Sequence, residues 1–266
     1  MKPFALFLVV ILLASACATR PTGRKQLMIV SEEHAIEASK QAYTEALKPF
    51  ASEGKLDNDP ILKARVNTIT SRLIAQAVIM RPETRNWEWS IKILDDPKTV
   101  NAWCMAGGKM ALYTGLIKQV NPTDDELAQV MGHEIAHALA NHTAEKMSVA
   151  IASSVGVAAV GAATDRPAVT MASVAVAALA VKLPNSRVAE TEADRIGIEL
   201  AAKAGYDPRA AVSLWEKMAR VSRGSSQMEF LSTHPNPGNR QSRLRQLVPQ
   251  MMPYYERGGN RPVYPL

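Results

Sequence analysis

One segment, residues 123–139, constrains the fold of this chain more than any other. It contains the pattern His133-Glu134-x-x-His137, and four residues advance an α-helix by about 400°. The two imidazoles therefore project from one face of the helix, one turn apart, where both can bind the same zinc ion. Glu134 follows the first histidine and can reach a water on that ion as a general base. The alternative is a buried helix whose histidines serve only packing.

The residues around this pattern favour a buried helix. Thr123 and Glu126 form a T-x-x-E capping box directly after Pro122, which is typical of a helix N-terminus. Apolar residues then recur at i, i+4 spacing. They are Leu127, Met131, Ile135 and Leu139. This stripe buries one face of the helix and so fixes the direction in which the two histidines point.

A zinc site needs a third protein ligand, and a catalytic site keeps a fourth position open. His142 follows closely, but its spacing does not match the metzincin pattern, so we interpret it as a helix-end residue facing the helix dipole. Glu190 and Asp194 share a face of a predicted helix, where one can bind the metal while the other orients a liganding histidine. Glu192 points to the other side and, like Glu199, is interpreted as part of a solvated face.

Several motifs, in order along the chain, resemble a family of zinc metallopeptidases that includes the bacterial proteins HtpX, LoiP and BepA, the CAAX prenyl endoprotease and the mitochondrial OMA protease. The matching segments are Asn101-Ala102, residues 108–117, His133–His137, residues 186–194 and residues 232–240. They span about residues 30 to 250. The family is metallopeptidase family forty-eight, of the gluzincin type, and the layout is most similar to LoiP-type periplasmic lipoproteins.

This resemblance implies roles for individual residues. The metal ligands of one Zn²⁺ per chain would be His133, His137 and Glu190. Glu134 would be the general base, and Asp194 would support a ligand. His234 falls where the family places a histidine near the active site. It could stabilise the tetrahedral oxyanion or, as in BepA, occlude the metal in a resting state, and a plain loop histidine is the third interpretation.

The N-terminus resembles a signal peptide. Lys2 supplies a basic start, residues 4–13 are apolar, and small residues follow up to position 16. A membrane-spanning helix needs about 20 apolar residues, so this run is too short to be one. We therefore expect residues 1–16 to be removed on export.

Cys17 stands directly after this small-residue site, as in a bacterial lipobox. Ala14 departs from the usual pattern, in which Leu is found at that position, so cleavage by the ordinary signal peptidase is the alternative. If Cys17 is acylated, its lipid chains anchor the mature protein. Ala18 after the cysteine favours the outer membrane, and residues 17–29 are expected to form a lipidated polar tether.

We predict an α+β, predominantly helical fold of the zincin type, with a small sheet next to the HExxH helix. One metallopeptidase domain is expected over residues 30–252. In addition to the helices that carry the motifs, the pattern predicts helices at residues 31–50, 61–80, 208–221 and 240–251. Alternating apolar residues and a Gly-Gly turn predict strands at residues 87–93, 100–105 and 109–114.

Two further segments have an unusual composition. Residues 147–183 are rich in small residues and nearly uncharged, which indicates a helical hairpin or lid whose halves are too short to cross a bilayer. Two roles are equally possible for this segment. It can form a lid or a surface that contacts the membrane, or it can serve only packing. Residues 253–266 contain three Pro and two Gly, and we expect a loose tail there.

The charge and cysteine content narrow the possible partners. The net charge of +6 is thinly spread, and its basic clusters lack interleaved aromatic residues, so nucleic-acid binding is not expected. Modest attraction to anionic membranes is the more natural consequence. With Cys17 used as an anchor, Cys104 is the remaining thiol, which rules out an internal disulfide in the mature chain. The apolar neighbours of Cys104 favour a buried, inert thiol.

Together these features predict a zinc-dependent endopeptidase of the bacterial cell envelope, lipid-anchored in the periplasm at the outer membrane. The resemblance to LoiP and BepA implies misfolded or stalled envelope proteins as substrates and the outer-membrane assembly machinery as a partner. One alternative is a zinc-closed periplasmic chaperone or assembly factor with little turnover, in which His234 blocks the fourth position. Another is a purely structural helical lipoprotein.

Overall fold

The protein is described here by a computed structural model. It describes residues 17–19, 24–158, 175–176, 179–180, 182–224, 229–235 and 238–266. The predicted signal peptide and most of the predicted lid at 147–183 lie outside the described residues. Of Cys17, the predicted lipidation site, only the backbone is described.

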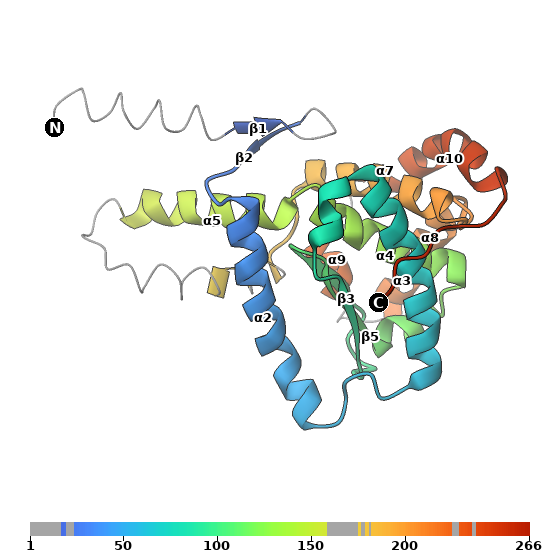
Figure 1. Ribbon diagram of the computed structural model, residues 1–266, viewed down its shortest axis with the longest axis horizontal. Helices are drawn as coiled ribbons and strands as arrows, with labels where there is room; N and C mark the ends of the chain where they lie inside the picture. Colours follow the sequence, from blue (N-terminus) through green and yellow to red (C-terminus); the bar gives the residue numbers. More distant parts are fainter. Residues whose placement is uncertain are drawn as a thin grey trace.

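Helices dominate the structure and surround one small sheet (Figure 1), which confirms the predicted fold class. The described α-helices are α2 (Glu32–Ser52), α3 (Pro60–Met80), α4 (Asp124–Leu139), α5 (His142–Ala158), α7 (Arg187–Lys203), α8 (Ala210–Gly224), α9 (Glu229–Thr233) and α10 (Arg240–Glu256). Two short helices complete the set, the 3-10 helix η1 (Pro82–Asn86) and the π-helix η2 (Leu116–Val120). Among the helices that the structure describes, none has the length and apolar character required to cross a bilayer.

Side-chain caps explain where the main helices begin. The Ser31 side chain accepts a hydrogen bond from the backbone of His34 at the start of α2, and Asp59 caps α3, whose first residue is Pro60. The predicted capping box of α4 is confirmed, because both of its reciprocal hydrogen bonds between Thr123 and Glu126 are present. These caps satisfy backbone N–H groups that have no partner inside the helix.

The sheet has three strands, β3 (Ser90–Leu94), β4 (Ala102–Met105) and β5 (Lys109–Tyr113). β5 is central and pairs in parallel with β3 and antiparallel with β4. The pairing of β3 begins at Ser90, three residues after the predicted start of the strand. β4 is therefore an edge strand of the described sheet.

Helices cover both faces of the sheet. One face joins the main core together with α3 and α4, and includes Ile93, Met110 and Leu112. The other face packs against α2, where Tyr43 lies edge-on to Trp103. Figure 1 shows the sheet between α2 and α3. Burial on both faces fixes the sheet, and its strand β4 lies beside α4, which carries the HExxH motif.

The contact between α4 and α7 is unusually close because glycines face each other. A Cβ atom at Gly132 would lie 2.8 Å from the carbonyl oxygen of Gly197, and a Cβ at Gly197 would lie 2.8 Å from the backbone nitrogen of His133. Real Cβ atoms do not approach other heavy atoms so closely, so the two backbones can touch only because both residues are glycine. This contact brings Glu190 on α7 within reach of the histidines on α4.

The two ends of the described chain differ from the predictions. In place of a tether, β1 (Cys17–Thr19) pairs antiparallel with β2 (Lys25–Leu27), and Gln26 is buried and donates a hydrogen bond to the carbonyl of Ala140. The predicted loose tail is also wrong for the backbone that the structure describes. α10 continues to Glu256, and Tyr264 donates a backbone hydrogen bond to Ser71.

The reason for the ordered C-terminus lies in one side chain. Arg261 donates hydrogen bonds to the carbonyl of Lys203 at 3.1 Å and to that of Tyr255 at 2.9 Å. Carbonyls at helix C-termini lack partners within the helix, and one guanidinium satisfies carbonyls from both α7 and α10. Composition alone therefore underestimated the order of this segment.

Cys104 lies on β4 and is buried, as predicted. Burial raises the pKa of its thiol well above the ordinary value, with a further contribution from the nearby charge of Glu134. Because the thiolate is the reactive form of cysteine, the raised pKa disfavours reaction at this thiol.

Candidate metal centre

Four buried side chains from three parts of the chain meet beside the sheet. His133 and His137 come from α4, Glu190 from the first turn of α7, and His234 from the residue after α9. One ligand atom from each lies within 4.8 Å of all the others. We call these four residues the ligand cluster. Glu190 has no exposed surface at all, and carboxylates are almost never buried so completely unless they are paired.

The spacing of the atoms in the ligand cluster fits a tetrahedral ion. The Nε2 atoms of His133 and His137 are 3.1 Å apart. Nδ1 of His234 lies 3.3 Å from Nε2 of His133 and 3.0 Å from Oε1 of Glu190. With metal–ligand bonds of about 2.0–2.1 Å, neighbouring ligands of a tetrahedral ion are about 3.3 Å apart. The cluster could therefore hold a metal ion, with His234 at the fourth position.

The charges of the ligand cluster also suit a cation. Burial opposes ionisation of Glu190, but hydrogen bonds from three histidines outweigh it and hold the pKa of its carboxyl far below the ordinary range. Burial lowers the pKa of His137 well below its usual value, so this imidazole is neutral. Burial also acts to lower the pKa of His133, but its hydrogen bonds to Asp194 and Glu190 raise that pKa to about 9. A cation bound there would take the place of the proton on His133.

Glu134 lies at the edge of the ligand cluster with a nearly fully buried side chain. Its Oε1 atom is 3.3 Å from Nε2 of His234, and this oxygen has no hydrogen-bond partner among the described residues. Burial raises the pKa of this carboxyl above the ordinary value, although the nearby histidines oppose the rise. A carboxylate with a raised pKa beside the ligand cluster is suited to accept a proton.

His133 is supported by a carboxylate and an arginine. Its Nδ1 lies 3.0 Å from Oδ1 of Asp194, so the structure places Asp194 against this histidine and against no other member of the cluster. Arg240 pairs with Asp194 at 2.5 Å and with Glu190 at 3.0 Å, and its guanidinium lies over the ring of Trp215 at 3.6 Å. Sequence reasoning assigned no role to Arg240, which is fully buried and links both carboxylates.

His137 is supported through a second imidazole. Its Nδ1 lies 2.8 Å from Nδ1 of His142, and Nε2 of His142 lies 3.1 Å from Oε2 of Glu192. Arg24 then donates a hydrogen bond to the same Glu192 oxygen at 2.7 Å. We call His142, Glu192 and Arg24 the imidazole relay.

Two sequence interpretations are corrected by this relay. His142 was expected to face the helix dipole, but Asn141 adopts a left-handed conformation with φ 56°, and the chain folds back so that His142 lies against His137. Glu192 was expected on a solvated face, yet it is 7 % exposed. It does face away from Glu190, as the helical geometry requires, but α5 and the residue before β2 cover that side as well.

Asn185 is another residue that sequence reasoning missed. Its side-chain amide nitrogen lies 3.2 Å from Nδ1 of His234 and 3.5 Å from Nε2 of His137. Its backbone N–H donates to the carbonyl of Thr233 at 2.9 Å. The segment before α7 is thereby tied to the end of α9, which positions His234.

Comparison with known proteins gives the family. Residues 60–248 match the sequence profile described as peptidase family M48. This match runs from α3 into α10 and includes the complete ligand cluster. The chain belongs to peptidase family M48. The family predicted from the motifs is therefore confirmed.

Curated M48 relatives include mitochondrial and bacterial proteins. The chain is 31 % identical over 263 residues to the mitochondrial metalloendopeptidase OMA1 of Bos taurus, covering 95 % of this chain and 50 % of that protein. It is 31 % identical over 218 residues to the beta-barrel assembly-enhancing protease of Escherichia coli K12, covering 78 % of this chain and 43 % of that protein. This M48 chain therefore spans half or less of the length of these relatives.

Proposed function

We propose that this protein is a zinc-dependent endopeptidase in which His133, His137 and Glu190 hold the metal. The observation that carries this proposal is the ligand cluster, in which two imidazoles and an ionised carboxylate converge at tetrahedral spacing. Two histidines and one glutamate are one of the known ligand sets of catalytic zinc sites. The M48 membership of the chain supports the same activity.

The proposed chemistry uses Glu134 as general base. A zinc ion held by the cluster supplies Lewis-acid polarisation of the peptide carbonyl and lowers the pKa of water toward about 7. Glu134 accepts the proton of the attacking water and passes it to the nitrogen of the leaving amine, so the peptide bond breaks and no net proton is consumed. Asp194 and the imidazole relay keep the spare ring nitrogens of the two histidines oriented.

An extended substrate is the natural partner for this site. β4 is an edge strand of the described sheet, and Trp103 and Cys104 on β4 line the same cavity as Glu134 and His137. A peptide that adds to this edge forms main-chain hydrogen bonds without reading its sequence. We infer broad specificity for unfolded segments of proteins.

The position of His234 supports a second candidate function. Nδ1 of His234 stands at the fourth position of the tetrahedron, where a catalytic site has to admit water. The arrangement favours a resting state that is closed by His234 and opens when substrate displaces it. A protein that stayed closed would be a metal-stabilised chaperone or assembly factor with little turnover.

The cellular setting is also part of the proposal. We infer a bacterial envelope protein that is anchored through Cys17 to the outer membrane, faces the periplasm and degrades misfolded or stalled envelope proteins. Its similarity to a beta-barrel assembly-enhancing protease supports a link to the outer-membrane assembly machinery.

The deciding experiment is cleavage of casein by purified protein with and without a zinc chelator. The endopeptidase proposal expects about one zinc per chain and chelator-sensitive cleavage, and Glu134→Gln should keep the metal while losing about 10²–10⁴-fold in rate. His234→Ala then separates the two candidate functions. Faster cleavage indicates an occluding histidine, and slower cleavage indicates a catalytic one. Bound zinc without cleavage in either protein indicates a metal-stabilised assembly factor without turnover.

A further inference from the structure

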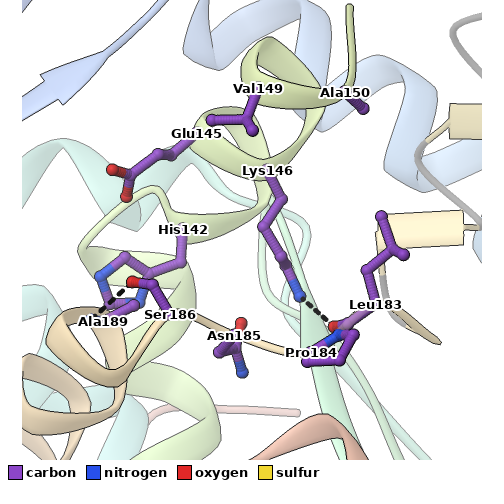
Figure 2. Close-up of a pocket in the computed structure, with 10 residues that line it drawn as sticks. All are labelled: His142, Glu145, Lys146, Val149, Ala150, Leu183, Pro184, Asn185, Ser186 and Ala189. Atoms are coloured by element: carbon purple, nitrogen blue, oxygen red, sulfur yellow. Dashed lines mark hydrogen bonds between the residues drawn. The ribbon is translucent and has the colours of Figure 1, made fainter. Parts of the chain in front are cut away.

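A cavity of about 340 Å³ lies next to the ligand cluster, between α5 and the segment that leads into α7. Figure 2 shows its lining residues. Half of the ten lining residues are apolar, namely Val149, Ala150, Leu183, Pro184 and Ala189. The volume falls within the range of about 300–1,000 Å³ that is usual for ligand sites.

The cavity and the ligand cluster share a wall. Asn185 lines the cavity, and its amide contacts His137 and His234 on the other side. Lys146 likewise lines both this cavity and the smaller one that contains Glu134. A residue of a peptide seated in the cavity would therefore lie close to the bond that the metal centre cleaves.

Lys146 is the unbalanced charge of this cavity. Figure 2 shows its side chain extending from α5 toward Leu183 and Pro184. Its ammonium donates to the carbonyl of Leu183 at 3.4 Å, which is long for a hydrogen bond, and it forms no ion pair with the residues that the structure describes. Burial lowers the pKa of Lys146 to about 8, while Glu134 and Glu190 act from a distance to raise it.

The other charged lining residue, Glu145, is engaged by Arg24, which also pairs with Glu192. Glu145 accepts two hydrogen bonds from Arg24, at 2.7 Å and 2.6 Å. Its carboxylate therefore does not balance Lys146. An apolar occupant would displace the remaining water from the ammonium without replacing its hydrogen bonds, which is costly. A carboxylate would supply those hydrogen bonds with full charge.

We propose that this cavity binds a carboxylate of the peptide substrate at a residue beside the scissile bond, with Lys146 as its counter-ion. The apolar walls fit the methylene groups that carry the carboxylate. The carboxylate can belong to an Asp or Glu side chain or to the free C-terminus of the peptide. This inference rests on the proposed endopeptidase function, because that function makes the occupant a peptide.

Binding is measured first, with zinc-loaded Glu134→Gln protein so that peptides are held without being cleaved. Fluorescently labelled peptides carry Glu, Gln or Leu at one position, each with a free or an amidated C-terminus. We expect a carboxylate-bearing peptide to bind about tenfold or more tightly than its neutral counterpart, because hydrogen bonds between charged groups are strong when desolvated. The free and amidated termini reveal which carboxylate is recognised.

The variant that carries the test is Lys146→Met, which keeps the length of the side chain and removes its charge. The preference for the carboxylate should disappear, while the affinity for the Leu peptide stays the same or rises. Lys146→Arg should retain part of the preference. The matched control is Lys182→Met, which removes an exposed cation next to Leu183 and should leave the preference unchanged.

Cleavage by wild-type protein then tests the position of the recognised residue. Cleavage sites in casein are mapped by mass spectrometry, and acidic residues or chain ends should be enriched at one fixed position beside the bond. Equal binding of Glu, Gln and Leu peptides would overturn the inference, and so would a carboxylate preference that Lys146→Met retains. Cleavage without that preference leaves the endopeptidase standing, whereas bound zinc without any cleavage contradicts the endopeptidase itself.

Discussion

The two histidines of α4 lie one turn apart, yet their outer nitrogens are held in different ways. His133 contacts the carboxylate of Asp194 directly at 3.0 Å. His137 contacts the neutral ring of His142 at 2.8 Å, and the carboxylate of Glu192 follows one step further away. Each ligand thus has a carboxylate behind it, one in contact and one at the end of a relay.

The relay determines which nitrogens carry protons. If Nε2 of His137 faces a metal, its proton sits on Nδ1 and is donated to Nδ1 of His142. His142 then carries its own proton on Nε2 and donates it to Glu192. Burial lowers the pKa of His142, which keeps this ring neutral and able to accept. The difference teaches that two ligands on one helix can be supported in two ways, by a carboxylate in direct contact or by a carboxylate that acts through a second imidazole.

The largest expected effect comes from removing the contact that both histidines share. Glu190 lies 3.4 Å from Nε2 of His133 and 3.3 Å from Nε2 of His137. Glu190→Ala should lose stoichiometric zinc and, with it, all chelator-sensitive activity, as measured by metal analysis and casein cleavage. Glu199→Ala is the control, because Glu199 pairs with Lys203 on the same helix and should keep a full equivalent of metal. Zinc retained by Glu190→Ala would contradict the ligand set.

The direct support of His133 comes next. Asp194→Ala should weaken zinc affinity by about 10–100-fold, as the loss of a carboxylate behind a liganding histidine typically does. Titration against a chromophoric chelator measures this change. Circular dichroism of the metal-free protein is needed beside it, because Arg240 loses a buried partner in this variant. Unchanged affinity in a folded variant would show that the contact with Asp194 is incidental.

The relay behind His137 should have a smaller effect. His142→Phe keeps the ring shape but removes the acceptor of the His137 proton, and we expect zinc affinity to fall by about tenfold, the lower end of the range for such contacts. Glu192→Gln retains an acceptor for His142 and should have a smaller effect still. The absorption spectrum of the cobalt-substituted protein reports whether the ligand geometry shifts. If Glu192→Gln weakens binding more than Asp194→Ala, the relay is the dominant support.

The smallest expected effect is the coupling free energy between Asp194 and His142 in zinc binding. Asp194 and His142 contact different ligands, so their effects on zinc affinity should add within about 0.3–0.5 kcal/mol in the double variant. The double-mutant cycle uses the same chelator titration as the single variants. A coupling well above this value would mean that both supports act on one shared movement of α4.

The parts of the site that could be predicted are local in sequence. The spacing of His133, Glu134 and His137 and the cap at Thr123 depend on helix geometry over a few residues. The placement of Glu190 and Asp194 on one helix face depends on the same geometry, and the structure brings both carboxylates against His133. The predominantly helical fold with a small sheet followed from the same periodicities.

The parts that were missed depend on packing between distant segments. His142 contacts His137 only because Asn141 turns the chain in a left-handed conformation, and such a turn has no clear signal in the pattern of apolar residues. Glu192 is buried because Arg24, 168 residues earlier, covers it. Arg240 reaches Asp194 from another helix. A helical pattern shows which residues share a face, but it does not show whether a second partner covers the opposite face.

The contact between Gly132 and Gly197 has a consequence for the precision of the metal centre. The width of the ligand cluster depends on how far apart α4 and α7 stand, and here two backbones in direct contact set that distance. If side chains separated the two helices, a change of rotamer could alter the distance between them. Two backbones in direct contact have no such freedom. The dimensions of the ligand cluster are therefore set by the main chain itself, one residue away from the first histidine.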